Sequence, residues 1–471
     1  MISKADSVLA GFRSVLRQSI LRTGDIDKAV IIGEALGQLN WANNDGLLHE
    51  EPLEAALYDQ HRTKITGAVQ TVSTQPIEWL HVISRAHEIG GHTRLLRMLV
   101  DAQRRAGQRV AVAVTRSGKE ALLRSLKEPS VVFHEIKGSP LQRVAKLVEL
   151  GHSAKQVALH IHPDDLAAAL AARHLALEGR RVLFVNHADH VFSYGAGAAN
   201  VCLEVSGFGW RLTTARRMVR EQHFLGIPIT DAAAESPACA PAGPPGKIVF
   251  SMGNASKYRP TADYDFPAFA SDLLDRSSDI AMEIVGPEPT DPHWSKPLAR
   301  HGSRLRLLGR LPFEDTSARL SSAAAYVDSF PVTGGTAFPQ ALLSGRSVFG
   351  PSAHAGGYSL ADALRYPTVS EMTNALVTFL RTGIRHSNED QIRDRIKQQF
   401  NADATAQRLE AAAQGLLEIA PPELLSSPCT LDYHVNSWRA KGRVELVWRI
   451  LRRRRLPFTF RERAALLRCA F

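Results

Sequence analysis

The stretch VALHIHPDDLAAALAARHLALEGRRVLFVN, residues 157–186, decides the fold class of this chain. It begins and ends with a short apolar run, which is typical of a strand buried on both faces of a sheet. Between these runs, residues 164–179 carry apolar side chains at helical spacing, and Pro163 and two aspartates stand where a helix would begin. A strand, a helix and a second strand in this order predict a βαβ unit with parallel strands.

The same alternation continues on both sides of this stretch and predicts two similar α/β domains with parallel sheets. The strands expected in the first domain are residues 79–84, 109–115, 131–136, 157–162, 181–186 and 200–206. The strands expected in the second domain are residues 247–252, 280–286, 305–309, 324–330 and 347–350.

The expected domain boundaries follow from a segment in which Ala, Pro and Gly supply twelve of sixteen residues, 231–246. This composition is typical of a linker between domains. We therefore expect a helical N-terminal segment (1–70), a first α/β domain (71–230), a second α/β domain (247–420) and a helical C-terminal tail (421–471).

The composition is that of a globular protein: 471 residues, 44% hydrophobic and 22% charged, enough for two or three hydrophobic cores. No signal peptide and no run of apolar residues long enough to span a membrane is found, so we expect a cytoplasmic protein, soluble or peripheral on the membrane. The cysteines are too far apart for a disulfide framework or a structural zinc site, which fits a reducing compartment: Cys202, Cys239, Cys429 and Cys469.

The net charge of +10 is concentrated in the tail. Asn436 to Phe471 hold eleven basic and two acidic residues and so carry +9, which leaves +1 for the rest of the chain. A near-neutral body argues against a nucleic-acid groove, and we expect no specific nucleic-acid partner. Aromatic residues interleave with the arginines, as in basic helices that bind anionic membranes. Two other roles are possible for this tail: a solvated face or a docking face within the molecule, and binding of an acidic polymer or nucleic acid.

A candidate phosphate site lies in DSFPVTGGTAFPQALLSGRSVFG, residues 328–350. An expected strand ends near Asp328, a loop follows, and a helix opens at Thr336. Unpaired backbone N–H groups at Gly334, Gly335 and Thr336, with the positive end of the helix dipole, would suit a phosphate. An ordinary turn of a βαβ unit is the alternative interpretation.

A second candidate lies after the first strand of the second domain, where a polar loop carries Asn254 and Lys257. Ligands of parallel sheets collect at the carboxyl ends of the strands, so Lys257 is placed to neutralise a diphosphate. A solvated loop lysine is the alternative.

These segments resemble the donor half of O-linked N-acetylglucosamine transferases and related bacterial sugar transferases. The resemblance extends over residues 79–370 and rests on the spacing of six residues: Asp328, Gly334, Thr336 and Gly345, and Lys257 with Pro260. It implies the GT-B architecture, two Rossmann-like domains facing each other across a cleft. It further implies that Lys257 and the amides near Gly335 and Thr336 hold the diphosphate of a nucleotide sugar, with no metal ion or other cofactor.

Two departures from the family pattern bear on mechanism. The family's His-Thr-Thr-Gly stretch reads Gly335-Thr336-Ala337-Phe338 here, which removes a side-chain contact to phosphate. Many retaining GT-B enzymes have two glutamates eight positions apart in this region, and Val332 and Gln340 occupy those positions here. This pattern favours an inverting reaction.

In the first domain, Gly90, Gly91 and His92 lie at a strand-to-helix turn that resembles the family's Asn-His-Pro turn, with His92 at the histidine position. An inverting transfer needs a base for the acceptor proton, and a histidine suits this role. A helix-start histidine bonded to the backbone is the alternative.

The loop after the fifth expected strand, NHADH, adds His187, Asp189 and His190. A carboxylate beside an imidazole orients it and raises its basicity, so His187 with Asp189 is a second candidate base, and His190 is expected on the acceptor side. Similar loops occur in bacterial sugar transferases. A polar loop that satisfies its own backbone is the alternative.

A metal-dependent hydrolase is a rival hypothesis, because His160 and His162 have a metal-ligand spacing at a strand end. The linker after the sixth strand does not fit a single barrel, which makes this the weaker hypothesis.

We therefore expect an inverting glycosyltransferase of the hexosyl or N-acetylhexosaminyl type. It would move a sugar from a nucleotide-diphosphate donor, a UDP-sugar by resemblance, to a glycan, lipid-linked or protein acceptor. Two further hypotheses stay open: a nucleotide-sugar epimerase of the same fold, and a non-catalytic protein that binds a sugar or a lipid.

Overall fold

The computed structural model describes residues 4–470 with the following gaps: 71–75, 87–90, 119, 121, 123–130, 230–246, 353, 355, 427–429, 431 and 453–455. The expected linker, 231–246, and Gly90 therefore lie outside the described residues.

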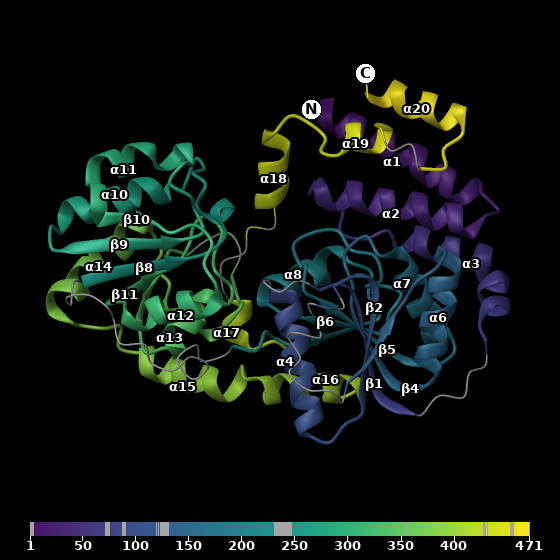
Figure 1. The fold of residues 1–471 in the computed structure, drawn as a ribbon, viewed down its shortest axis with the longest axis horizontal. Helices are drawn as coiled ribbons and strands as arrows, with labels where there is room; N and C mark the ends of the chain where they lie inside the picture. Colours follow the sequence, from purple (N-terminus) through teal and green to yellow (C-terminus); the bar gives the residue numbers. More distant parts are fainter. Residues whose placement is uncertain are drawn as a thin grey trace.

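The first domain contains a parallel sheet of seven strands in the order β3-β2-β1-β4-β5-β6-β7 (Figure 1). The strands are β1 Ile77–Arg85, β2 Val110–Ser117, β3 Val132–Glu135, β4 Ala154–His160, β5 Arg181–Asn186, β6 Val201–Glu204 and β7 Glu221–Phe224. Six of them were expected. The sequence of β7, EQHF, has no apolar run, and this strand forms because its backbone pairs with β6, with His223 opposite Leu203.

Helices cover both faces of this sheet, because alternate residues of its strands point to opposite sides. On one face, Leu80 and Val82 of β1 pack in the same core as the N-terminal helices. On the other face, Trp79 and Ile83 pack with a different set of helices. The helices within this domain are α4 Gly91–Arg105, α6 Pro140–His152, α7 Leu166–Leu177 and α8 Gly207–Arg216.

The second domain contains a parallel sheet of five strands in the order β10-β9-β8-β11-β12. Each strand lies where the sequence predicted one: β8 Lys247–Met252, β9 Ile280–Val285, β10 Leu305–Leu307, β11 Ala325–Val327 and β12 Ser347–Phe349. Its helices are α10 Phe266–Arg276, α11 Ser295–His301, α12 Phe313–Ser322, α13 Ala337–Leu343, α14 Val369–Thr382 and α15 Glu389–Gln399. Four short 3₁₀ helices lie between them: η1 Ala255–Tyr258, η2 Pro292–Trp294, η3 Gly302–Arg304 and η4 Leu360–Leu364. The expected fold class, two α/β domains with parallel sheets, is confirmed.

The chain crosses back to the first domain through α16 (Ala402–Ala413). Leu409 and Ala412 of this helix are buried in the core that contains Trp79. The indole of Trp79 also donates a hydrogen bond to Glu410 (3.1 Å). Part of the segment expected in the second domain therefore packs on the first sheet.

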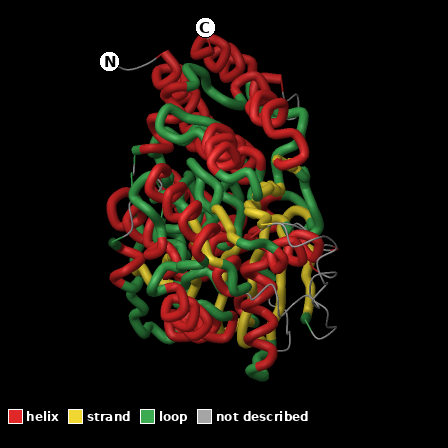
Figure 2. Tube along the Cα trace, turned by 90° about the vertical axis from the view of Figure 1, so that its left-hand side faces the viewer, coloured by secondary structure: helices red, strands yellow, loops and turns green. Residues whose placement is uncertain are grey.

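The two ends of the chain lie together at the helix-rich end of the molecule (Figure 2). The N-terminal helices are α1 Lys4–Arg22, α2 Ile26–Ala42 and α3 Glu51–Ala68. The C-terminal helices are α17 Pro422–Leu425, α18 Tyr433–Ala440, α19 Val447–Arg452 and α20 Phe460–Ala470. Figure 1 shows α20 beside α1, and α18 between the two domains.

The described part of the tail packs against the N-terminal helices. Trp438 is buried and donates its indole N–H to Asn43 Oδ1 (3.0 Å). Ile450 and Leu466 are buried in the core that contains Phe12 of α1. The tail thus forms a docking face within the molecule, which is one of the three roles predicted for it. Within the described residues, no helix is both long enough and apolar enough to cross a membrane.

Candidate active site

The carboxyl ends of the two sheets face each other, as two contacts between segments that follow strands show. The amide of Gly207, just after β6, donates to the carbonyl of Gly357, which follows β12 (2.7 Å). The guanidinium of Arg94 in the first turn of α4 lies 4.9 Å from the ring centre of Phe313, which follows β10. Residues of both sheet edges are therefore adjacent, where ligands of parallel sheets bind.

On the second domain, a buried charge cluster shapes the loop after β11. Asp328 has no exposed surface, accepts the amide of Gly334 (3.0 and 3.1 Å to its two oxygens), and pairs with Arg365 (2.8 Å). Glycine is required at 334 because a Cβ atom there would lie 2.5 Å from Asp328 Oδ1. The expectation of an unpaired amide is therefore wrong for Gly334. Its N–H donates to the carboxylate of Asp328, and this bond shapes the loop.

Lys257 lies directly against this glycine loop, residues 333–336. Its Nζ donates to the carbonyl of Thr333 (2.7 Å), because β8 and β11 are neighbours and their loops leave the sheet side by side. Burial lowers the pKa of Lys257, while Asp328 acts in the opposite direction. Asn254 is exposed and accepts the amide of Lys257 at its carbonyl (2.9 Å). Two segments far apart in the sequence thus form one cationic loop pair.

The rest of the glycine loop leads into a helix as predicted. Thr336 precedes α13 as its N-cap residue. A Cβ atom at Gly335 would lie 3.0 Å from the ring of Tyr358, so the glycine permits close packing of these two loops. The amides of Gly335 and Thr336 remain the candidates for phosphate in this loop.

On the first domain, the structure brings together the histidines of two separate motifs. Gly91 is exposed and begins α4, and His92 follows it. The imidazoles of His92 and His187 are stacked, with ring centres 3.9 Å apart and 10° between their planes. We call these two residues the histidine pair. The sequence predicted each as a base, but not their contact.

Backbone carbonyls orient both rings. His92 Nε2 lies 2.9 Å from the carbonyl of His160, and His187 Nδ1 lies 3.3 Å from the carbonyl of Val185. A carbonyl accepts only an N–H, so the neutral tautomers carry their lone pairs on His92 Nδ1 and His187 Nε2. Burial lowers the pKa of His187 well below its ordinary value, and the neighbouring His92 lowers it further. His187 is therefore a neutral imidazole at neutral pH.

Asp189 has a different environment from the expected one. Its Oδ2 accepts the hydroxyl of Ser206 (2.5 Å), and its Oδ1 lies 3.1 Å from Nδ1 of His190. Ser206 also caps α8 by accepting the amide of Gly209 (2.8 Å). Among the contacts of the described residues, the carboxylate–imidazole pair is therefore Asp189 with His190, and the expected pair of Asp189 with His187 is wrong.

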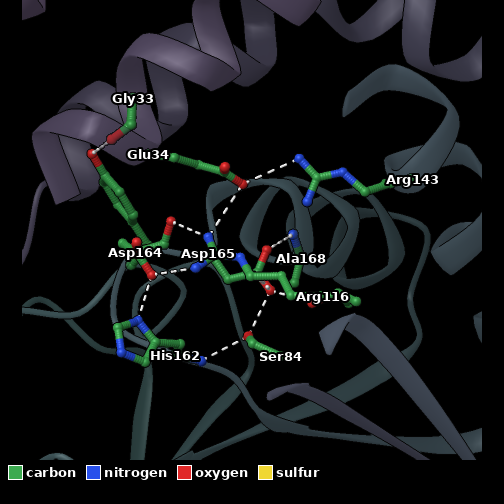
Figure 3. Close-up of polar contacts among 11 residues, drawn as sticks. Gly33, Glu34, Ser84, Arg116, Arg143, His162, Asp164, Asp165 and Ala168 are labelled. Atoms are coloured by element: carbon green, nitrogen blue, oxygen red, sulfur yellow. Dashed lines mark hydrogen bonds and ion pairs between the residues drawn. The ribbon is translucent and has the colours of Figure 1, made fainter. Parts of the chain in front are cut away.

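A network of charges lies beside these histidines, at the carboxyl ends of β2 and β4 (Figure 3). Arg116 donates to Asp164 Oδ1 (2.6 Å) and contacts Glu34 Oε1 of α2 (3.3 Å). His162 bonds to Asp164 through Nδ1. Burial raises the pKa of Asp164, but the hydrogen bond from His162 and the charge of Arg116 outweigh burial and lower this pKa. The network ties helix α2 to the edge of the first sheet.

Sequence reasoning missed this network because its members come from distant segments. It did identify Asp165 as part of a helix start, and Asp165 accepts the amide of Ala168 in the first turn of α7 (3.3 Å). The same carboxylate accepts the hydroxyls of Ser84 (2.6 Å) and Thr115 (2.5 Å). Polar residues at the ends of β1 and β2 were the available signal.

The histidines of the metal hypothesis have separate partners. His160 is buried, and its Nε2 lies 3.0 Å from Nδ1 of His81, whereas His162 bonds to Asp164. In the part of the chain that the structure describes, no group of three or more His, Cys, Asp or Glu side chains is arranged to hold a metal ion.

No protein-family model and no curated protein matches the sequence, but solved structures match the fold. HepE of Anabaena, in complex with UDP-glucose, has a TM-score of 0.52 at 15% identity and covers 72% of this chain and 100% of that chain. A mutant O-GlcNAc transferase of Thermobaculum terrenum has a TM-score of 0.51 at 16% identity, over 82% of this chain and 77% of that chain. The lipopolysaccharide outer core galactosyltransferase WaaB, in its apo form, has a TM-score of 0.50 at 12% identity, over 72% of this chain and 100% of that chain.

These structures are GT-B glycosyltransferases, and at such low identities the likeness establishes the fold alone. This chain has two parallel sheets whose carboxyl ends face each other. The chain therefore has the GT-B fold, as the resemblance in its sequence implied.

Proposed function

We propose that the protein is an inverting glycosyltransferase that moves a hexosyl or N-acetylhexosaminyl group from a nucleotide-diphosphate sugar to a glycan, lipid-linked or protein acceptor. One observation carries the proposal: Lys257 bonds to the glycine loop at the edge of one sheet, and the histidine pair lies at the facing edge of the other. UDP-glucose is bound in the similar structure of HepE, and this favours a UDP-sugar as donor.

The proposed reaction is a direct displacement. The acceptor oxygen forms a bond to the anomeric carbon while the bond from that carbon to the diphosphate oxygen breaks. His187 through Nε2, or His92 through Nδ1, takes the acceptor proton. Lys257 and the amides of Gly335 and Thr336 stabilise the negative charge that develops on the departing diphosphate.

The charge cluster has a positioning role in this scheme. Asp328 holds the loop through Gly334, and Arg365 neutralises Asp328, so the carboxylate does not repel a diphosphate. Lys257 therefore carries the charge available to the leaving group in this loop. The scheme uses charges of the protein in the place of a divalent cation.

A thermal-shift panel of uridine, guanosine and thymidine diphosphates tests the donor. A ligand that binds the folded state raises its melting temperature, and we expect the largest rise with UDP. Turnover is then followed with the matching UDP-sugars, with and without candidate acceptors. Isomerised donor formed without an acceptor would indicate an epimerase, and no rise with any nucleotide would refute a nucleotide-sugar enzyme.

We place the reaction in the cytoplasm, where the cysteines need no disulfide partner, and at an anionic membrane surface if the acceptor is lipid-linked. Two aromatic side chains of the docked tail remain exposed, Trp448 (54%) and Phe460 (87%). These residues and the neighbouring arginines support a peripheral membrane contact of the tail.

A further inference from the structure

The segment that follows α2 lies against the loop after β5, which carries His187 and His190. The side-chain amide of Asn44 donates to the carbonyl of His190 (2.9 Å). The amide of Ser193 donates to the carbonyl of Leu48 (3.1 Å). The N-terminal helices, which pack on one face of the first sheet, therefore reach the acceptor side of the proposed site.

Trp41 stands at the end of α2 that is closest to this loop. Its side chain is 41% exposed, although ten of the seventeen residues of α2 are buried. Its indole meets the imidazole of His162 edge-on, with ring centres 5.1 Å apart and 62° between the planes. His162 follows β4, the strand next to β5, whose end carries His187. Trp41 is thus an exposed aromatic ring at the carboxyl end of β4, the strand next to the one whose end carries His187.

The surroundings hold the backbone next to Trp41 in place. Asn43 is buried, and its Oδ1 accepts the indole N–H of Trp438 (3.0 Å) and the amide of Glu445 (2.8 Å). Asp45 receives two hydrogen bonds from Arg13 (2.5 and 2.9 Å). The backbone on the C-terminal side of Trp41 is therefore fixed by both ends of the chain. An aromatic side chain on a fixed backbone loses less entropy when a ligand stacks on it than one on a flexible loop.

We propose that Trp41 is the stacking platform of a carbohydrate subsite on the acceptor side, and that it selects acceptors carrying a pyranose ring there. A pyranose has an apolar face of C–H groups and a rim of hydroxyls. The indole suits the apolar face, while the imidazoles of His162 and His190 supply hydrogen-bond partners for the rim. The side chain of His190 is 44% exposed and accessible for this contact. The inference rests on the proposed function, because it assigns the acceptor of that same site.

A glycan array overlaid with the full chain tests the subsite. We expect binding to pyranose-containing glycans, about tenfold weaker for Trp41→Ala and within about threefold of wild type for Trp41→Phe, which keeps an aromatic face. Trp448→Ala is the matched control, because Trp448 is similarly exposed but contacts Arg452 on the tail helix α19. Binding of no glycan by the wild type, or equal binding by wild type and Trp41→Ala, would overturn the proposal.

The UDP thermal shift separates this inference from the proposed function. Trp41→Ala should have a melting temperature close to that of the wild type, because the ring lies at the surface, and should keep its full UDP shift. A UDP shift without Trp41-dependent glycan binding refutes the subsite alone. Trp41-dependent glycan binding without a nucleotide shift refutes the transferase and leaves a carbohydrate-binding site.

Discussion

The edges of the two sheets are built from different chemistry. On the second domain, charged side chains are tightly paired: Asp328 with Arg365, and Lys257 against the glycine loop. On the first domain, the sheet edge carries the two stacked imidazoles of the histidine pair, and burial keeps His187 neutral. A departing diphosphate needs fixed positive charge, whereas an acceptor hydroxyl needs a base with a vacant lone pair. The contrast indicates that the two halves of the reaction are assigned to different domains.

The largest expected effect is a loss of turnover when a histidine of the acceptor side is removed. We expect His187→Ala or His92→Ala, whichever removes the base, to lower kcat by about 10²- to 10⁴-fold, the usual contribution of a general base. The measurement is turnover of the UDP-sugar identified in the thermal-shift panel, alongside the UDP shift itself. The shift should be unchanged, because neither imidazole belongs to the donor loop. Full activity in both variants would remove the histidine pair from the mechanism.

The next largest expected effect is a loss of stability on the donor side. Asp328→Ala leaves the buried Arg365 with Asp362 alone and should cost about 3–5 kcal/mol of unfolding free energy. Asp272→Ala is the matched control, because Asp272 forms an exposed pair with Arg276 and should cost less than about 0.5 kcal/mol. Urea denaturation of both variants measures the difference. Equal costs would mean that the cluster around Asp328 does not hold the loop.

The variant Lys257→Ala tests directly whether the donor side binds the diphosphate. Loss of a charged hydrogen bond to phosphate is worth about 1.5–3 kcal/mol, so we expect UDP to bind about 10- to 100-fold more weakly. Titration calorimetry with UDP measures this, and the exposed Lys296→Ala on α11 is the control. An unchanged affinity for UDP would place the diphosphate elsewhere.

A smaller effect concerns the histidines behind the acceptor side. Burial lowers the pKa of His81 to about 4, against the opposing hydrogen bond with Gln103. Between pH 4 and 6.5 the unfolded state then binds more protons, so stability falls as the pH decreases. His81 alone lowers the free energy of unfolding by about 1.4 kcal/mol between neutral pH and pH 5.5. Urea denaturation at pH 7.5 and 5.5 should show a smaller difference for His81→Gln, and an unchanged one for the exposed control His293→Gln.

The smallest expected effect lies outside both domains, in the tail. Cosedimentation should show weak binding to vesicles containing phosphatidylserine, and no binding to vesicles of phosphatidylcholine, since each cation adds only about 1 kcal/mol near an anionic surface. Phe460→Ala should weaken it, because this ring is 87% exposed on the docked tail. Equal binding to both vesicles, or to neither at low salt, would leave the tail as an intramolecular clamp only.

Much of the fold was predictable because the signals are local. Apolar runs predicted six strands of the first sheet and all five of the second, whereas β7 has no such run and depends on its pairing with β6. In the site, the sequence placed Lys257 and the glycine loop each at the carboxyl end of a strand of the second domain, and the structure joins them. It could not assign the amide of Gly334 to Asp328, because that bond depends on how the loop turns back.

The sequence by itself determined the two parallel α/β domains, the basic tail and the residue types at each strand end, because these depend on periodicity and composition along short segments. Only the tertiary structure decided that His92 stacks on His187, that Asp189 pairs with His190, and that the N-terminal helices bring Trp41 to the same edge. Those contacts join residues from separate elements, and their geometry follows from how the helices and sheets pack, which no local pattern specifies.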